Sequence, residues 1–572
     1  MAVMIPDEFD GTSKGEKRIF CELQELPDDV IAYHNPRIKQ REPDFVVIAP
    51  SIGVIVIEVK GIALNWITSA DERDIQYRQA GQERTEKHPG RQARDYMNRL
   101  RDLCRAHPQA DQLMQGGRFA FAFGHVAILT AIHRGELDAK PWGGVFPPDE
   151  TVCSDELEAA LGRPEALMQM LRRAIYKEIP ITPLSPARVR LVRSIISPAG
   201  RVDPGPYPPG VSTPDTVEML DFEQEKAART IGTGHRILYG VPGSGKTVIL
   251  VAMARLLAQD EKSVLVLCYN NSLYAYLERT LKELRPFVRV QKFGAWARDQ
   301  GAPVNSDEET FGQGLLNIMQ TGGGQAGKYD AVLIDEGQDF RASWFRSAVM
   351  ALSEPADGTL VIAYDLAQNL YGADKPVWSR LGIKAPGRIR KFEKNYRNTR
   401  EIVGAAWSFG LPEAPTDDDT PYPVALKPEN CLRSGPWPVF QSFANRREQI
   451  LGHVELAKNL IAGNAVGGVR LESVRAEEIM ILCKLNATKD ELAAELSRNG
   501  MPVNVSTIHG SRGLQAKAVI VVEAENLRDP DDRALMYVAA TRPTDLLCVL
   551  WSRETSITKE LSRNLQDAQI SP

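Results

Sequence analysis

The segment from Gly240 to Thr247 reads GVPGSGKT, which is the GxxxxGK[ST] pattern of a phosphate-binding loop. It follows the apolar run RILY and precedes the helical run VILVAMARLL, so the loop would end at a helix N-terminus, where backbone N–H groups favour phosphate. Lys246 would reach the β- and γ-phosphates of a nucleotide, and Thr247 would bind Mg²⁺. The residues expected to bind the nucleotide are Gly240, Pro242, Gly243, Ser244, Gly245, Lys246 and Thr247.

Two adjacent carboxylates follow another apolar run, in the segment VLIDEGQD at 332–339. A phosphate loop of this type needs a metal-holding carboxylate at the end of a neighbouring strand. Asp335 would hold Mg²⁺, directly or through water, and Glu336 would polarise the attacking water. The loop and the carboxylates together predict hydrolysis of a nucleoside triphosphate.

A second set of charged residues, Asp44, Glu58 and Lys60, forms the pattern D…ExK near the N-terminus. Glu58 and Lys60 are two positions apart on a predicted strand and share one face, while Asp44 begins the neighbouring strand. Two carboxylates can hold Mg²⁺ beside a scissile phosphate, and a lysine can position the water or stabilise the transition state. Because the run before Glu58 is wholly apolar, charges at its end require a partner or a metal. The pattern predicts metal-dependent phosphodiester hydrolysis.

Strands and turns must position these residues. The segment DFVVIAPSIGVIVIEVKG at 44–61 predicts two buried strands joined by a turn at 50–53, followed by a helix at 89–103 and a strand at 119–131. Further along, strand-like runs alternate with helical stretches, which indicates parallel sheets with covered faces. These runs lie at 236–241, 264–270, 331–336, 359–365, 478–484 and 518–524. The Pro- and Gly-rich segment at 197–215 predicts a linker.

The composition bounds the class of protein. A chain of 572 residues has room for roughly three or four domains, and 43% hydrophobic with 25% charged residues excludes a disordered, collagenous or disulfide-scaffold chain. The net charge of −5 gives no overall reason to expect an anionic partner, so a nucleic-acid site would be a local patch. Seven scattered cysteines without a CxxC pair argue against a zinc site and a secreted disulfide framework. No apolar stretch reaches the ~18 residues of a membrane helix, so a cytoplasmic protein is expected.

Seven ordered motifs over about 217–552 resemble those of UvrD-like superfamily 1 DNA helicases. They are DFEQEKAA around Gln224, the phosphate loop, DEGQD, YDLAQNLY (364–371), KNYRNT (394–399), STIHGSRGLQ (506–515) and MYVAATRP (536–543). The resemblance implies two RecA-like lobes and a motor that acts on DNA. It also implies ATP as the nucleotide, because Gln224 matches the glutamine that reads adenine.

The same resemblance assigns roles to single residues. Gln338, Asp365 and Gln368 match residues that sense the γ-phosphate and link it to the DNA track. Arg397 and Arg542 match the two arginines that reach the γ-phosphate from the second lobe. An arginine delivered across a cleft makes hydrolysis depend on closure of the lobes. By position in their motif, Thr507 and His509 would lie near the strand that couples to DNA.

The chain departs from the helicase pattern in places. Gln515 stands where the family has the glutamate of KGLE, which puts a nucleotide contact in doubt, and Pro543 ends the last motif. After Tyr371 the chain lacks the longer aromatic segment that stacks bases in relatives. Since stacking contributes roughly 1–3 kcal/mol per base, DNA would be held more weakly or by other aromatic residues. The candidates are Phe293, Trp296 and Trp378, which could equally be core aromatics.

The N-terminal set resembles the PD-(D/E)xK nucleases, and over roughly 15–129 the pattern of GE, DFVVI, IEVKG and RQ is similar to the nuclease-related domain called NERD. The resemblance implies that Asp44 and Glu58 are metal ligands and that Lys60 is the catalytic lysine. Gln92, in a QxxxY pattern with Tyr96, would help to orient the site, and Glu16 would be an accessory acid.

A basic segment from Arg84 to Arg105 surrounds Gln92. Its basic residues are Arg84, Lys87, Arg91, Arg94, Arg99, Arg101 and Arg105, against the acids Glu86, Asp95 and Asp102. Such a segment would bind DNA phosphates without sequence preference and with a salt-dependent affinity; the alternative is a solvated helix face. A second cluster of Arg188, Arg190 and Arg193 would do the same or dock the domains together.

The sequence therefore predicts an α/β chain with a NERD-like nuclease domain at 1–198, a linker at 199–215, and RecA-like lobes at 216–393 and 394–572. The expected function is that of an ATP-dependent DNA nuclease-helicase that uses Mg²⁺, or Mn²⁺ at the nuclease site, in defence against foreign DNA or in DNA repair. The alternative is an ATP-gated DNA-binding or remodelling protein with an inactive nuclease-like domain. A kinase or GTPase is disfavoured by Arg397 and Arg542 in their motifs. DNA, single-stranded or duplex with a single-stranded region, is the expected partner, with no membrane, and a homo-oligomer or a protein partner stays open.

Overall fold

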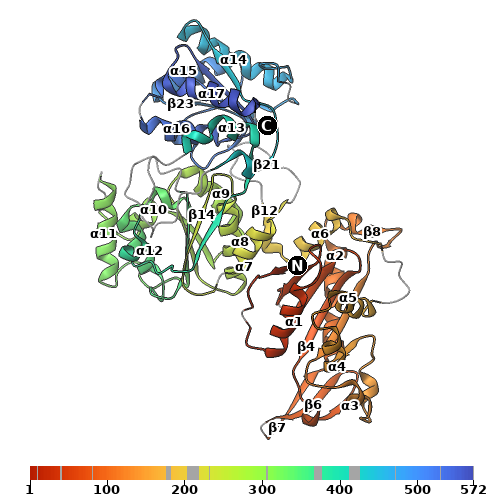
Figure 1. The fold of residues 1–572 in the computed structure, drawn as a ribbon. Helices are drawn as coiled ribbons and strands as arrows, with labels where there is room; N and C mark the ends of the chain where they lie inside the picture. Colours follow the sequence, from red (N-terminus) through yellow and green to blue (C-terminus); the bar gives the residue numbers. More distant parts are fainter. Residues whose placement is uncertain are drawn as a thin grey trace. The chain divides into compact units, whose positions relative to one another are not determined.

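The structure, a computed structural model, describes residues 1–9, 11–38, 42–79, 81–175, 182–202, 218–230, 232–303, 307–365, 376–410, 426–469, 472–528 and 530–570. The chain packs into two units (Figure 1): Met1–Arg201 with Met219–Thr230, and Val202–Glu218 with Ile231–Pro572. Most of the linker expected at 199–215 lies outside the described residues. The sequence predicts that the next domain begins at 216, whereas helix α7 (Phe222–Arg229) groups with the first unit.

A six-stranded sheet of order β1-β2-β3-β4-β10-β11 forms the centre of the first unit. Its strands are β1 (Val3–Ile5), β2 (Ile31–His34), β3 (Phe45–Ala49), β4 (Gly53–Lys60), β10 (Phe123–Leu129) and β11 (Thr151–Cys153). The predicted hairpin is confirmed, because β3 and β4 are antiparallel and Ala49 pairs with Gly53. Gly53 has a φ of 143°, and a Cβ there would lie 2.2 Å from the Ala122 carbonyl oxygen, so the turn requires glycine.

Two amphipathic helices, α1 (Lys14–Gln24) and α2 (Pro89–Ala106), supply apolar side chains to the opposite faces of this sheet. Side chains of β4 alternate between them: Ile55 and Ile57 share a core with α1, and Val54 and Val56 share a core with α2. A three-stranded antiparallel sheet lies in the chain between β4 and α2; it consists of β5 (Ile67–Ala70), β6 (Asp74–Gln79) and β7 (Gln82–Lys87). The other described helices before α7 are α3 (Arg134–Asp138), α4 (Ser154–Ala160), α5 (Pro164–Arg173) and α6 (Pro186–Ile196).

The second unit contains two parallel sheets, which confirms the predicted α/β class. The first sheet has the order β16-β15-β17-β18-β14-β19. Its strands are β14 (His235–Gly240), β15 (Val264–Cys268), β16 (Val288–Lys292), β17 (Ala331–Ile334), β18 (Thr359–Tyr364) and β19 (Ile389–Phe392). Its helices are α8 (Lys246–Gln259), α9 (Asn271–Leu281), α10 (Phe293–Asp299), α11 (Glu308–Gln320) and α12 (Ala342–Ala351).

The second parallel sheet has the order β22-β26-β25-β23-β24. Its strands are β22 (Val439–Ser442), β23 (Ile479–Cys483), β24 (Asn504–Thr507), β25 (Ala516–Val521) and β26 (Pro543–Trp551). The helices are α13 (Arg400–Ala406), α14 (Arg446–Ala462), α15 (Asn486–Arg498), α16 (Pro530–Ala540) and α17 (Ser556–Ile570). Outside both sheets, β20 (Asn395–Thr399) pairs with β21 (Cys431–Arg433). Within the described residues, no helix is both long and apolar enough to cross a bilayer.

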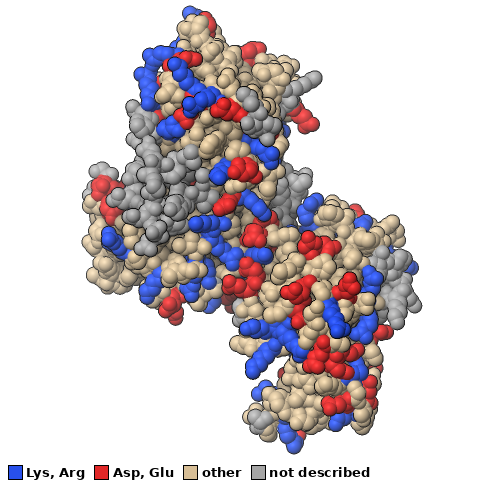
Figure 2. Space-filling view, in the orientation of Figure 1, with Lys and Arg blue, Asp and Glu red and all other residues tan. Residues whose placement is uncertain are grey.

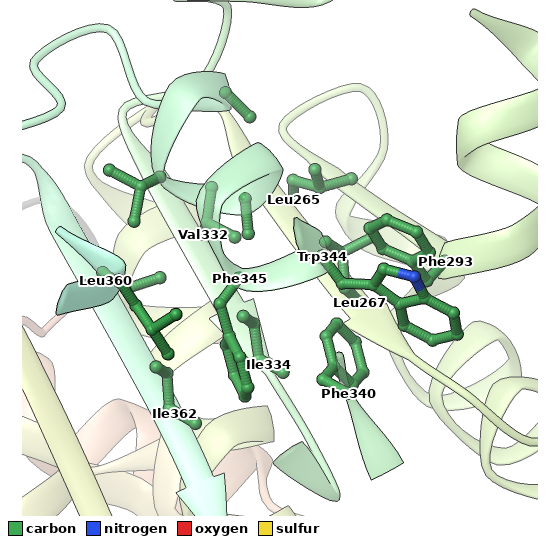
Figure 3. Close-up of a cluster of buried hydrophobic side chains, with 14 of the residues drawn as sticks. Leu265, Leu267, Phe293, Val332, Ile334, Phe340, Trp344, Phe345, Leu360 and Ile362 are labelled. Carbon is green, nitrogen blue, oxygen red and sulfur yellow. The ribbon is translucent and has the colours of Figure 1, made fainter. Parts of the chain in front are cut away.

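Aromatic side chains form much of the first lobe's core (Figure 3). Phe293 stacks on Trp344 with ring centroids 4.2 Å apart, and both rings lie among the apolar side chains of β15 and β17. Phe293 and Trp296 are completely buried, so they are core residues and not the base-stacking residues that the sequence allowed. Trp378 is half-buried, and its indole N–H donates to the Tyr239 hydroxyl over 2.7 Å. Tyr269, directly after β15, and Phe287 are exposed aromatic residues of this lobe that sequence reasoning did not consider.

Candidate functional site

The hairpin brings the three N-terminal candidates together. Continuing the antiparallel register of β3 and β4 by one residue places Asp44 opposite Glu58. Glu58 and Lys60 continue the face of β4 that packs on α2, and the Lys60 amine lies 3.2 Å from Glu58 Oε1. The Asp44 carboxylate accepts the backbone N–H of Val59 over 2.6 Å. The D…ExK pattern therefore forms one cluster at the end of the hairpin.

Burial makes the two carboxylates resist ionisation. It raises the pKa of Glu58 to about 8, with a further contribution from Asp44, although Lys60 opposes the shift. Burial likewise raises the pKa of Asp44 to about 6, against the hydrogen bond from Val59. Burial lowers the pKa of Lys60, but the charges of Glu58 and Asp44 outweigh it and the net pKa is raised. Two carboxylates that repel each other in a poorly solvated place are stabilised by a cation between them.

The donor set fits a divalent metal held by few protein ligands. Glu58 Oε2 is buried and accepts no hydrogen bond, so it is available as a ligand. No group of three or more His, Cys, Asp or Glu side chains arranged to hold a metal occurs in the described part of the chain. A cation here would thus be held by Asp44 and Glu58 and would complete its shell with water or phosphate oxygens, as Mg²⁺ commonly does.

The accessory residues lie around this cluster. Glu16, on α1, is near enough for its charge to raise the pKa values of both Asp44 and Glu58. Gln92 lies on α2, which covers the Glu58 face, and its side-chain amide donates to the Tyr96 hydroxyl over 3.1 Å. Sequence reasoning assigned no site role to Glu86 of β7, whose charge raises the pKa of Lys60 and whose carboxylate accepts the Tyr77 hydroxyl over 2.5 Å. Nothing in the sequence of residues 82–87 indicates that Glu86 lies near Lys60.

Without metal, the protein is expected to lose stability as pH rises toward 8. The pKa of Glu58 is about 8 in the fold instead of its ordinary 4.5, so between these values the unfolded carboxyl releases a proton that the folded one keeps. The free energy of unfolding then falls with rising pH, by an amount on the order of a few kcal/mol. Glu58→Gln should remove the contribution of Glu58, while Asp44, Asp335 and Asp339, whose pKa values are also raised, keep part of the dependence. Thermal unfolding in chelator from pH 5 to 9 measures the difference between the variant and the wild type. Glu25→Gln, at an exposed carboxylate, is the control; parallel curves for the wild type and Glu58→Gln would contradict the expectation.

The phosphate loop joins β14 to α8, as predicted. Gly243 and Gly245 have φ angles of 74° and 85°, which turn the backbone around the loop at no steric cost. The Lys246 amine donates to the carbonyls of Gly240 over 2.7 Å and Val241 over 3.1 Å, and it lies 3.6 Å from Asp365. Lys246 is buried and its amine points back over the loop, in the place where a phosphate would neutralise it.

The carboxylate that faces this loop does not come from the adjacent strand. The sequence predicts a neighbouring strand, but β18 lies between β14 and β17, and Asp335 follows β17. Asp335 still reaches the loop, because Thr247 forms a hydrogen bond with its side chain. Burial raises the pKa of Asp335 to about 7, and its Oδ2 accepts no hydrogen bond. The pair of Thr247 and Asp335 therefore fits a Mg²⁺ ion bound beside the phosphates.

Two hydrogen bonds of the Gln338 side chain link Glu336 to Asp365. The Gln338 amide donates to the Glu336 carboxylate, and its carbonyl accepts the backbone N–H of Asp365 over 3.0 Å. Glu336 has a φ of 52°, a left-handed conformation that is uncommon for a residue other than glycine. Gln338 thus connects the carboxylate that would polarise water with the residue beside Lys246. Gln368 lies outside the described residues.

Of the two predicted arginines, Arg397 lies beside the phosphate loop, and Arg542 lies near enough to Glu336 and Asp365 for their charges to affect its pKa. A Cβ on Gly243 would lie 2.8 Å from the Arg397 Cβ, so the loop touches β20 at this residue. Arg542 is buried, and its guanidinium donates to the Val538 and Leu514 carbonyls over 3.0 and 3.2 Å. Burial lowers the pKa of Arg542 to about 9, Arg397 lowers it further, and Glu336 and Asp365 oppose the shift. These mutual effects place the two arginines and the two acids around one site.

A buried ion pair that the sequence did not indicate also joins the two lobes. Arg512 donates to Asp339, at the end of the DEGQD motif. Burial raises the pKa of Asp339 to about 7, although Arg512 opposes this. The signal was available in part, because Arg512 stands where the helicase family has the lysine of KGLE. Two asparagines beside Arg397, Asn395 and Asn398, were missed as well.

Three further predicted residues, Gln224, Thr507 and His509, have the following surroundings within their own units. Gln224 belongs to α7 and accepts the backbone N–H of Asp221 over 3.1 Å, so it caps its own helix. Thr507 ends β24 and accepts the Gly510 N–H over 3.1 Å. His509 lies two residues further on, and burial and the charge of Arg512 lower its pKa.

Arg193, which the sequence allowed as a DNA contact, instead docks α7 within the first unit. Its guanidinium lies 2.6 Å from the Glu225 carboxylate and 3.3 Å from the Tyr33 hydroxyl. Arg229 adds a hydrogen bond to Ser197 over 3.0 Å. Because Arg193 and Glu225 are both buried, removing either partner would leave an uncompensated charge, so the pair ties α7 to this position.

Comparison with known proteins agrees with the motifs. Residues 12–122 match the nuclease-related domain, NERD, and residues 502–550 match the UvrD-like helicase C-terminal domain. UvrABC system protein B of Syntrophotalea carbinolica is 37% identical over 87 residues, and that of Helicobacter pylori is 35% identical over 88 residues. Each match covers 15% of this chain and only 12% of the relative's length.

Among solved structures, the C-terminal domain of a possible DNA helicase from Lactobacillus plantarum WCFS1 matches 30% of this chain and 96% of its own. The sequence identity is 19% and the TM-score is 0.23. The family matches confirm the recognition made from the motifs. The chain carries a nuclease-related NERD domain at 12–122 and a UvrD-like helicase C-terminal domain at 502–550.

Proposed function

We propose that this protein is an ATP-dependent DNA nuclease-helicase, in which a superfamily 1 motor on DNA is coupled to metal-dependent phosphodiester hydrolysis. The observation that supports the proposal is the set of contacts at the phosphate loop: Lys246 lies 3.6 Å from Asp365 and Asp335 bonds to Thr247, while Arg542 of the second lobe is affected by the charges of Glu336 and Asp365. Defence against foreign DNA and DNA repair are the roles that such an activity would serve.

At the motor site, the chain's own residues divide the work. Lys246 and the loop N–H groups bind the phosphates of ATP, and Thr247 and Asp335 would hold the Mg²⁺ that neutralises their charge. Glu336, held by Gln338, orients and polarises the attacking water. Arg397 and Arg542 stabilise the charge that develops on the transferred phosphoryl group, so hydrolysis requires both lobes.

At the N-terminal site, Asp44 and Glu58 would hold Mg²⁺ or Mn²⁺, which activates water and stabilises the phosphorane-like charge. Lys60 positions that water and favours the ionised form of Glu58 through their 3.2 Å contact, against the effect of burial. Gln92 orients the substrate side of the site from α2. The chemistry is hydrolysis of a phosphodiester bond.

The basic residues of α2 support DNA as the partner. Arg99 and Arg105 are exposed, and Arg91, Arg94 and Arg101 are partly exposed, on the helix that covers the Glu58 face of the sheet. Lys87 is paired with Asp95. On the face drawn in Figure 2, acidic and basic side chains are interspersed, so the attraction for phosphates is local and not a property of the net charge.

An ATP-gated DNA-binding protein with an inactive nuclease-like domain is the second candidate. The small number of ligands at Asp44 and Glu58 favours it, because a cation held by two carboxylates binds more weakly than one in a closed cage.

Two assays on the purified protein test the proposal. ATP turnover is measured with and without single-stranded DNA, and cleavage is measured on linear, circular, single-stranded and duplex DNA with Mg²⁺, Mn²⁺ or chelator, with and without ATP. We expect DNA-stimulated ATP hydrolysis and cleavage that chelator abolishes. A rate of ATP hydrolysis that DNA does not change would contradict the motor assignment. DNA-stimulated ATP hydrolysis without any DNA cleavage would support the second candidate.

A further inference from the structure

Two buried asparagines of β20 connect the phosphate loop with the backbone next to Arg542. Asn395 and Asn398 are completely buried, and they flank Arg397 in the KNYRNT segment. A buried amide that lacks partners is costly, so each side chain must have specific hydrogen bonds. Those hydrogen bonds define a path from the first lobe to the second.

Asn395 uses both ends of its side-chain amide. Its carbonyl oxygen accepts the backbone N–H groups of Arg397 over 2.8 Å and Asn398 over 2.7 Å. Because the oxygen faces two donors, the nitrogen must point the other way, where it donates to the Pro242 carbonyl over 2.9 Å and to Asn398 Oδ1 over 2.9 Å. Asn395 therefore ties the backbone at Arg397 to the phosphate loop.

Asn398 extends the path to the second arginine. Its amide nitrogen donates over 2.6 Å to the carbonyl of Pro543, the residue that follows Arg542. Parallel to this path, the backbone N–H of Tyr396 donates to the Gly243 carbonyl over 3.0 Å. One pair of amides thus connects the loop with the backbone beside both arginines.

We infer that Asn395 and Asn398 are positioning residues that hold Arg397 and Arg542 at the phosphate loop and so couple docking of the second lobe to hydrolysis. The inference rests on the proposed ATP hydrolysis. It states that hydrolysis depends on contact between the lobes because of the hydrogen bonds of these two side-chain amides, which we call the amide relay. The described hydrogen bonds of both asparagine side chains go largely to backbone groups, so each acts through a neighbouring backbone segment.

The chemistry of the amide gives a selective test. Each amide must donate and accept at once, whereas the carboxylate of aspartate has the same shape and cannot donate. Asn398→Asp places a carboxylate oxygen against the Pro543 carbonyl and leaves the contacts of the phosphate loop itself unchanged. It therefore breaks the relay at the Arg542 end without altering the nucleotide-binding residues.

The experiment compares steady-state ATP turnover, with saturating DNA, for the wild type, Asn398→Asp, Arg542→Ala and the double variant. We expect Asn398→Asp to lower kcat by about tenfold or more, as loss of an electrostatic stabiliser does, while KM for ATP and the affinity for a fluorescent ADP analogue stay within about twofold. Because the asparagine acts through the arginine, the double variant should lose little beyond Arg542→Ala. Asn464→Asp, at an exposed loop asparagine, is the control.

The outcomes separate the relay from the proposed function. If the wild type does not hydrolyse ATP, the proposed motor fails. If the wild type is active and Asn398→Asp keeps its kcat, or kcat and nucleotide affinity fall together, or the losses in the double variant simply multiply, the relay is overturned. If Asn398→Asp does not fold, Asn398→Ala removes the donor without adding a charge and is subject to the same criteria.

Discussion

Replacing Lys246 with alanine is expected to lower kcat for ATP hydrolysis by at least about 100-fold and to stop any ATP-driven movement on DNA. The amine lies inside the phosphate loop, bonded to the Gly240 and Val241 carbonyls and 3.6 Å from Asp365, so it would be the positive charge nearest to the phosphates. Phosphate release and strand-displacement assays measure the effect.

Lys262→Ala is the matched control for this variant, because Lys262 is an exposed lysine of the same lobe. DNA binding without nucleotide should be unchanged in both variants, since no DNA role is placed on either lysine. Turnover retained in Lys246→Ala would show that the loop does not bind the reacting phosphates, and the motor assignment would be abandoned.

Replacing Lys60 with alanine should lower metal-dependent DNA cleavage by a factor on the order of 100 or more. The variant removes the amine 3.2 Å from Glu58 Oε1, whose pKa is already about 8 through burial. Loss of this partner raises that pKa further, so at neutral pH fewer molecules hold the metal, and the lysine that positions the water is also gone. Cleavage of labelled DNA at saturating Mn²⁺ measures the loss, with DNA binding measured in chelator.

Lys17→Ala, at an exposed lysine of α1, is the matched control for Lys60→Ala. The pH profile separates the two roles of Lys60. If cleavage by the variant recovers at pH 9 with excess Mn²⁺, the lysine acts by keeping Glu58 ionised; if it does not recover, the lysine acts on the water or the transition state. Unchanged cleavage at pH 7.5 would contradict a catalytic N-terminal site that uses Lys60.

The sequence predicts the secondary structure around both sites well because the physical signals are local. The run before Glu58 is short, wholly apolar and rich in Val and Ile, which favours a buried strand, and the phosphate loop needs its glycines at fixed places between a strand and a helix. The hairpin, α2, and the strands that carry Asp335 and Asp365 all formed where the pattern predicts them. The cluster of Asp44, Glu58 and Lys60 follows from the two-residue period of a strand.

Other features of the two sites depend on the order of the strands and on contacts between distant residues, which no short sequence pattern encodes. Periodicity does not give the order of parallel strands, so the insertion of β18 between β14 and β17 could not be read from the run that ends at Asp335. Phe293 and Trp296 look alike in sequence whether they stack on bases or fill a core, and only burial distinguishes the two. Asn395 and Asn398 resemble loop asparagines, because the signal for a buried amide is its partners, which lie elsewhere in the chain.

After the Pro- and Gly-rich segment, the chain returns to the first unit at Met219–Thr230. The ends of this segment are joined, because β12 (Arg201–Val202) pairs with β13 (Glu218–Met219), and the Arg193–Glu225 pair then fixes α7 to the first unit. By its contacts the chain passes between the two units three times, after Arg201, after Glu218 and after Thr230. A single proteolytic cut within residues 203–217 would therefore divide the chain of the first unit into two pieces, held together by contacts such as the Arg193–Glu225 pair.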